Sequence, residues 1–136
     1  MQIQQVTTEE EYQKIDDFFS KMWKELFEID CKNQIDKYKL CDIYFFEENS
    51  QIISAIIYTN KKTGKNYIWR FWTLAEYRGK WLGTKLIKHI LEKYDWEMFL
   101  DADEKQVWFY EYIGFEKTWE SREVGNWLAF GMIYRK

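Results

Sequence analysis

With 136 residues, the chain can form one domain with a single core over residues 1–136, and its net charge of −3 argues against a nucleic-acid partner. The chain has one histidine, and its two cysteines, Cys31 and Cys41, form no CxxC pattern, so we expect no metal site. Two reduced cysteines suit a cytoplasmic protein, which is the location that we expect. We expect no secretory signal after Met1 and no membrane contact, because no apolar run reaches the roughly 18 residues that a membrane span needs.

The first part of the chain predicts a short strand and a helical region. Residues 1–6 alternate weakly between polar and apolar side chains, as in a short strand. Two overlapping capping boxes begin at Thr7 and Thr8, and apolar residues repeat at helical spacing after them. This pattern predicts either one long helix over residues 8–28 or two shorter helices that meet near Ser20.

The middle of the chain predicts a further short helix and three strands. The helix is expected within residues 31–41, and the strands over residues 42–48, 51–59 and 67–73. Asn49 and Ser50 separate the first two strands, which predicts a tight hairpin turn. The third strand is almost continuously apolar, which indicates a central strand that is covered on both faces.

The rest of the chain predicts a helix, a strand, a second helix and a closing hairpin with its turn around residues 123–126. These elements are expected over residues 83–94, 98–102, 104–112, 115–120 and 127–135. The strand, helix and strand over residues 67–102 would form a parallel crossover, whereas the other connections between strands are hairpins. The fold class is therefore α/β, with a mixed, mostly antiparallel central sheet and helices on both faces.

The segment Ala75–Thr84, with the sequence AEYRGKWLGT, separates the central strand from the following helix. Arg78, Gly79 and Gly83 fall where the chain turns sharply and begins that helix. Such a turn directs unpaired backbone N–H groups toward one point, at the positive end of the helix dipole. This geometry binds phosphate groups, although the same residues also suit a plain turn from strand to helix.

Together with the segment Phe109–Phe115 (FYEYIGF) and the order of elements, this turn resembles the GCN5-related N-acetyltransferase (GNAT) family. The family motif is R/Q-x-x-G-x-G/A; Arg78 and Gly83 match its ends, and Trp81 stands at its middle glycine. The resemblance implies the acyl-CoA N-acyltransferase fold. It also implies direct transfer of an acetyl group from acetyl-CoA to a primary amine of a small molecule or protein, and it allows a homodimer.

The resemblance also implies a set of site residues. Backbone groups of two strand residues would contact the pantetheine arm, and the amides of the turn would hold the pyrophosphate: Trp72 and Thr73 for the arm, and Arg78, Gly79, Lys80, Trp81, Leu82, Gly83 and Thr84 for the phosphates. Tyr110, four residues before Gly114, would be the general acid that protonates the departing CoA thiolate. Asp103 stands where the family often has an asparagine.

The general base is unassigned. The family often places a glutamate on the strand before the turn, but that strand carries Arg70 here and no acid until Glu76. Asp101, Asp103 and Glu76 are candidates, with bulk water as the remaining acceptor of the proton.

Several residues also have plain structural interpretations. Trp81 either points outward, covers the cofactor or obstructs the site, and Tyr110 is either a general acid or a core aromatic residue. Four tryptophans are expected in the core more often than in a substrate cage: Trp23, Trp69, Trp119 and Trp127. For the whole protein, the alternatives are a CoA-binding but catalytically silent regulator and an interaction protein that keeps only the fold.

Overall fold

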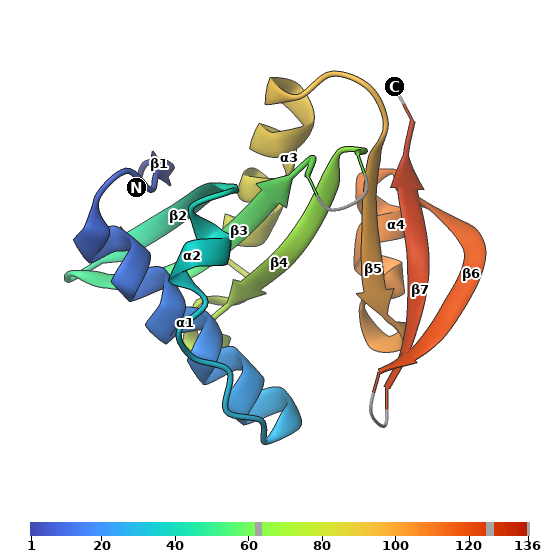
Figure 1. Cartoon of the computed structure of the whole chain (residues 1–136). Coiled ribbons are helices and arrows are strands. Elements are labelled where there is room, and N and C mark those ends of the chain that lie inside the picture. Colours follow the sequence, from blue (N-terminus) through green and yellow to red (C-terminus); the bar gives the residue numbers. More distant parts are fainter. Residues whose placement is uncertain (62–63, 125–126, 136) are drawn as a thin grey trace.

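Residues 1–61, 64–124 and 127–135 are described by a computed structural model, which is drawn in Figure 1. Within these residues, seven strands form one sheet, accompanied by helices α1 to α4 and the short 3-10 helices η1 and η2. The elements in chain order are β1 (Gln4–Gln5), α1 (Glu9–Phe27), α2 (Ile35–Tyr38), β2 (Asp42–Glu48), β3 (Gln51–Thr59), β4 (Tyr67–Thr73), η1 (Ala75–Tyr77), α3 (Leu82–Lys93), β5 (Met98–Asp103), η2 (Glu104–Gln106), α4 (Val107–Ile113), β6 (Glu116–Val124) and β7 (Trp127–Tyr134).

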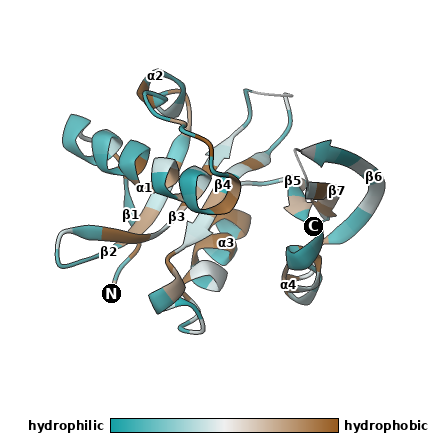
Figure 2. Ribbon diagram, turned by 90° about the horizontal axis from the view of Figure 1, so that it is seen from below, coloured by the Kyte–Doolittle hydropathy of each residue, from teal (hydrophilic) through white to brown (hydrophobic). Residues whose placement is uncertain are grey.

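The sheet has the strand order β1-β2-β3-β4-β5-β7-β6, with β4 at its centre. Strands β4 and β5 run parallel, and the other neighbouring strands are antiparallel. Helices α1 and α2 cover one face, and α3 and α4 cover the other (Figure 1 and Figure 2). The predicted fold class is therefore confirmed. No helix in the described parts of the chain is long and apolar enough to cross a lipid bilayer.

Helix α1 is one continuous helix, which decides between the two alternatives that its sequence left open. Of the two overlapping capping boxes, the second forms: Glu11 N–H donates to Thr8 Oγ1 (3.2 Å), and Thr8 N–H donates to Glu11 Oε1 (3.0 Å). Ser20 does not interrupt the helix, because its hydroxyl donates to the Cys31 carbonyl (2.7 Å) on the segment that leads to α2.

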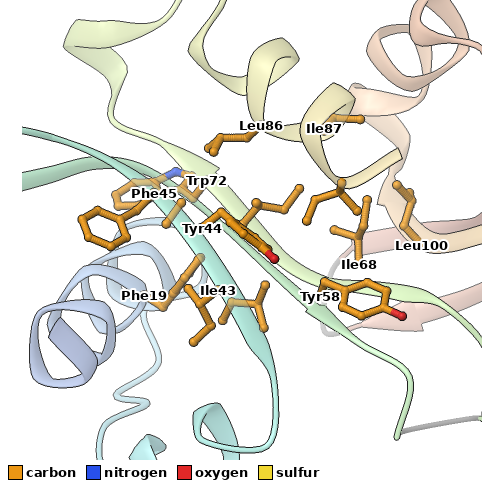
Figure 3. Close-up of a cluster of buried hydrophobic side chains, with 14 of the residues drawn as sticks. Phe19, Ile43, Tyr44, Phe45, Tyr58, Ile68, Trp72, Leu86, Ile87 and Leu100 are labelled. Carbon is orange, nitrogen blue, oxygen red and sulfur yellow. The ribbon is translucent and has the colours of Figure 1, made fainter. Parts of the chain in front are cut away.

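The hydrophobic core lies on both faces of the central strands (Figure 3). Phe19 of α1 packs on one face, and Leu86 and Ile87 of α3 pack on the other; all three are fully buried. Strand β3 between these layers is buried along nearly its whole length. Residues Asn49 and Ser50, which connect β2 to β3, have φ values of 52° and 64°, as the first and second central residues of a type I′ turn require.

The C-terminal part differs from its prediction in the helix after β5 and in the length of β6. The segment expected as one short helix over residues 104–112 divides into η2 and α4, because Asp103 accepts a hydrogen bond from Lys105 N–H (3.3 Å) and tightens the first turn. Strand β6 continues four residues beyond its predicted end. The predicted turn at residues 123–126 includes Gly125 and Asn126, which lie outside the described residues.

Strands β4 and β5 are paired over only two positions, Tyr67 with Phe99 and Ile68 with Leu100. Beyond Ile68, β4 pairs on this side with no strand of the described residues, and the two strands diverge toward the C-terminal end of β4 (Figure 1). The divergence begins at a bulge. Ile57 of β3 pairs with Arg70 while the next residue pairs with Ile68, which leaves Trp69 as the extra residue. We call this divergence the β4–β5 fork.

Candidate active site

The turn after β4 places free backbone donors at the start of a helix. After η1, the first backbone hydrogen bond of α3 runs from Lys85 N–H to the Trp81 carbonyl (3.0 Å). The N–H groups of Leu82, Gly83 and Thr84 therefore have no acceptor within the helix. They point out of the positive end of a 12-residue helix, where an anion is stabilised. The structure thus has the free helix start from which the sequence predicts a phosphate site.

Arg78 stabilises the turn through both its main chain and its side chain. Its N–H donates to the Ala75 carbonyl (3.3 Å), and its Nε donates to the Thr73 carbonyl (3.2 Å). The Arg78 amide is thus already used, unlike the role that the family resemblance gave it. The free donors of the turn come from the residues after Arg78.

Trp81, which replaces a glycine of the family motif, keeps the backbone conformation that a glycine would supply. Its φ and ψ are 66° and 12°, in the left-handed region, and it is the N-cap residue of α3. The side chain is 63% exposed, so the indole points outward and does not fill the turn. A left-handed conformation costs a non-glycine residue about 1–2 kcal/mol, so this turn is strained.

Gly83 allows α3 to begin close to β4. A Cβ atom at this position would lie 2.7 Å from Phe71 Cζ, which is closer than real Cβ contacts come. The Phe71 ring points to the face of the sheet that α3 and α4 cover, where it stacks on Phe109 of α4 with centroids 6.4 Å apart. Gly83 therefore serves the packing of helix against strand, in addition to carrying one of the free amides.

Backbone groups alternate along β4 between the β3 side and the fork. Leu74 N–H donates to the Ile53 carbonyl (2.9 Å), so the N–H groups of Trp72 and Arg70 also point toward β3. Those of Phe71 and Thr73 point into the fork. The Trp72 side chain is buried and packs on Phe18 of α1 (ring centroids 5.0 Å apart), so its backbone and its ring both point away from the fork.

Tyr110 lies on α4, next to the Phe109 ring that contacts β4. Its ring packs edge-on against Phe109 and the buried Phe115, with centroids 5.3 and 5.8 Å away. Burial raises the pKa of the Tyr110 phenol above its ordinary value. Within residues 1–61, 64–124 and 127–135, no group hydrogen-bonds to this hydroxyl, which is therefore available to a ligand.

The candidate general bases are engaged elsewhere or exposed. The Asp101 carboxylate accepts hydrogen bonds from the Tyr67 hydroxyl and from Arg122 Nη2 (2.8 Å). Asp103 caps the turn of η2, and Glu76 lies exposed in η1. In the described ranges, no group of three or more His, Cys, Asp or Glu side chains is arranged to hold a metal ion.

A cluster on the opposite face of the sheet was not recognised from the sequence. Arg70 of β4 lies among the rings of Trp23, Tyr38 and Trp69, which belong to α1, α2 and β4. The apolar repeat of α1 indicated which helix face Trp23 occupies, but no local pattern links it to Arg70. Trp119, which was expected in the core, is 86% exposed on β6, where its φ of 69° interrupts the regular strand.

Comparison with known proteins agrees with this geometry. A family model described as an acetyltransferase (GNAT) domain matches residues 6–135. Among curated proteins, no sequence matches significantly. The chain belongs to the GNAT acetyltransferase family, and it is an acetyl-CoA-dependent N-acetyltransferase whose acceptor is an amine.

Solved structures share the fold at low sequence identity. An aminoglycoside 6′-N-acetyltransferase complexed with coenzyme A has a TM-score of 0.79 and 11% identity, with 99% of this chain and 97% of that chain covered. An N-acetyltransferase from Staphylococcus aureus Mu50 has a TM-score of 0.75 and 17% identity, with coverage of 98% and 100%. A ribosomal-protein-alanine N-acetyltransferase from Brucella melitensis has a TM-score of 0.73 and 13% identity, with all of both chains covered.

The outward position of the indole leads to a prediction for Trp81. Replacing it by glycine should keep the dissociation constant of acetyl-CoA within about threefold in calorimetry, because both residues allow the turn and the ring lies outside it. Trp81→Val is the contrasting variant and should lower the free energy of unfolding by about 1 kcal/mol, since β-branched residues avoid positive φ. A tenfold gain in affinity for Trp81→Gly would show instead that the indole obstructs the site.

The close approach of Gly83 to Phe71 leads to a second prediction. Gly83→Ala should lower the free energy of unfolding by about 1–3 kcal/mol, because its Cβ drives the Phe71 ring toward the fork. The same displacement should weaken acetyl-CoA binding. Adding Phe71→Leu removes the ring tip and should recover most of the loss, as measured by urea unfolding in a double-mutant cycle with Phe71→Leu alone. Additive effects of the two substitutions would contradict this contact.

Proposed function

We propose that acetyl-CoA binds in the β4–β5 fork and that residues 1–136 act as one catalytic unit on an amine. The unpaired edge of β4, which ends beside a helix start with free amides, carries this proposal. Gly79 to Thr84 would hold the pyrophosphate, with Lys80 at the edge of the turn near the 3′-phosphate. Phe71 and Thr73 would contact the pantetheine through their backbone groups, with Phe71 in place of Trp72.

The residues of the fork divide the chemical work. Bound acetyl-CoA supplies the thioester that the deprotonated amine of the acceptor attacks. The N–H of Phe71 or Thr73 would donate to the carbonyl oxygen as negative charge develops there. Tyr110 would then give its proton to the departing thiolate sulfur, which suits a phenol because phenols and thiols have fairly similar pKa values.

The fate of the amine proton follows from the positions of the acidic residues. Asp101 is tied to Arg122 and Tyr67, and Asp103 caps η2, so neither carboxylate is positioned by its contacts as a base. We propose that the proton leaves to water. This favours amines that are already largely deprotonated near the working pH, since no side chain is assigned as the base that would remove the proton.

The setting of the reaction is also part of the proposal. Free Cys31 and Cys41 and the net charge of −3 support a cytoplasmic enzyme that acts on a small-molecule amine or a protein amino group and not on nucleic acid. The homodimer that the resemblance allows stays a prediction. A catalytically silent CoA-binding protein is less well supported, because the exposed Trp81 does not obstruct the turn.

Two measurements test the proposal in sequence. Calorimetry with acetyl-CoA should give a dissociation constant below a millimolar concentration, and release of free CoA thiol should then depend on an added amine. The amines tested should include amino acids, peptides, polyamines and aminoglycosides. No binding would contradict the cofactor site. Binding without turnover for any of these amines would favour a CoA-binding but catalytically silent regulator instead.

Tyr110→Phe should lower kcat by about 10²-fold or more while leaving the dissociation constant of acetyl-CoA unchanged. The matched control is Tyr112→Phe on the same helix. Tyr112 is 72% exposed, and its replacement should leave kcat nearly unchanged. Unchanged turnover in Tyr110→Phe would remove this residue from the mechanism.

The raised pKa of Tyr110 fixes the sign of the pH dependence. A general acid works in its protonated form, which is present below its pKa, and burial moves that pKa upward from about 10. The value of kcat should therefore rise as the amine deprotonates and should not fall again below about pH 10. A descending limb between about pH 8 and 10 that disappears in Tyr110→Phe would contradict the effect of burial.

A further inference from the structure

Arg70 is a cation at the origin of the fork. It follows the Trp69 bulge directly, at the point where β4 leaves β5. Its contacts with Trp23 of α1 and Tyr38 of α2 place its side chain on the face that α1 and α2 cover. Phe71, the next residue, points to the opposite face, toward α4. Arg70 thus lies across the strand from the side where Tyr110 lies.

No carboxylate neutralises this cation within the described parts of the chain. Arg70 Nη1 donates to the Tyr38 hydroxyl (2.6 Å), and Nη2 donates weakly to Cys31 Sγ (3.9 Å). The nearby buried carboxylate of Asp16 instead accepts from the N–H groups of Asn33 (3.1 Å) and Gln34 (3.0 Å). A partly buried guanidinium without an anionic partner is unusual, because burial of an unpaired charge is costly.

The surroundings of Arg70 have more donors than acceptors. Among the described residues, three buried side-chain nitrogens have no hydrogen-bond partner: Trp23 Nε1, Arg70 Nε and Trp72 Nε1. All three belong to α1 or β4, and all three are donors. Water could satisfy the two indoles, but it would not balance the charge of the guanidinium. The region lacks an oxyanion in particular, which is the group that a guanidinium binds with two parallel hydrogen bonds.

Aromatic rings surround the guanidinium and extend across the fork. The guanidinium carbon of Arg70 lies 4.5 Å from the centroid of the Trp69 ring and 5.2 Å from that of Trp23. Trp23 packs on Phe27, which in turn contacts Trp127 at the start of β7, with centroids 4.8 and 5.2 Å apart. These rings connect the end of α1 to the other half of the sheet. They form an apolar environment, in which the attraction between two opposite charges is stronger than in water.

We propose that Arg70 binds the carboxylate of the acceptor, so that the acceptor is an amino acid or peptide and not a polycationic amine. This inference rests on the proposed function, because it assumes that the acceptor amine reaches the fork. Arg70 lies one to three residues from the Phe71 and Thr73 amides, or about 3–10 Å along a strand. That separation suits a molecule that carries its amine and its carboxylate a few bonds apart.

A purely structural role for Arg70 predicts a different outcome. If the guanidinium only packs between rings, its removal should affect all acceptors equally through the shape of the site. If it binds a carboxylate, its removal should affect only acceptors that carry one. The comparison of matched acceptors with and without the carboxylate therefore separates the two roles.

The test compares three matched pairs of acceptors: phenylalanine with phenylalaninamide, tyrosine with tyramine, and glycylglycine with its C-terminal amide. The wild-type enzyme should show a kcat/KM about tenfold or more higher for the carboxylate member of at least one pair. Arg70→Gln should remove this preference, mainly through KM, while changing kcat/KM for the member that lacks the carboxylate by less than about threefold. Arg135→Gln is the control, because Arg135 is an exposed arginine paired with Glu97.

Thermal denaturation in the presence of CoA provides a readout that does not depend on turnover. The preferred carboxylate acceptor should raise the melting temperature of the wild type and of Arg135→Gln but not of Arg70→Gln. Its counterpart without the carboxylate should raise the melting temperature of none of the three proteins. Arg70→Gln should keep its own melting temperature and its acetyl-CoA affinity, since it loses an unpaired charge. Arg70→Met is the second variant if the glutamine variant is unstable.

The outcomes separate this inference from the proposed function. If acetyl-CoA fails to bind the wild type, the proposed function fails. If transfer occurs with equal kcat/KM for both members of every pair, or if Arg70→Gln lowers both members alike, only the role of Arg70 is overturned. Absence of any carboxylate-dependent thermal shift in the CoA-bound wild type also overturns it.

Discussion

The separation of β4 from β5 after Ile68 is the constraint on which the rest of the site depends. A strand in the middle of a sheet normally satisfies its backbone groups on both sides. Within the part of the chain that the structure describes, β4 pairs on one side only beyond the Trp69 bulge. The groups of Phe71 and Thr73 that point into the fork are therefore available to an extended ligand with amide groups of its own. The helix start at Leu82 adds donors for an anion at the end of the same strand.

Strain in the turn is concentrated at the site and is held in place by local contacts. Trp81 adopts a left-handed conformation that its side chain disfavours, and the Arg78 side chain ties the turn to the end of β4. The close contact between Gly83 and Phe71 fixes how far α3 stands from the strand. The position of the free amides is thus set by packing, and the unusual tryptophan is tolerated because its ring lies in solvent.

The two faces of the fork differ in their electrostatic character. On the α3 and α4 face, Tyr110 lies among Phe109 and Phe115, and this apolar setting keeps the phenol protonated. On the α1 and α2 face, Arg70 introduces a positive charge among aromatic rings. A neutral proton donor and a fixed cation on opposite faces of one strand suit a reaction in which the acetyl donor and the acceptor enter from different sides.

The sequence by itself determined most of the elements and the location of the turn. Local periodicity and turn chemistry are enough to define β2, β3 and β4 with the bounds that the structure has, and the two overlapping capping boxes place the start of α1 to within a residue. The segment from Arg78 to Thr84 also predicts a free helix start, because such a start is a property of the backbone.

Only the tertiary structure decided which side chains meet. The outward position of Trp81, the exposure of Trp119 and the place of Arg70 among Trp23, Tyr38 and Trp69 follow from contacts between distant elements. Such contacts leave no periodic pattern in the amino-acid sequence, because they depend on how the helices pack on the sheet. The physical reason is that backbone conformation is largely a local property, whereas the surroundings of a charge are set by the whole fold.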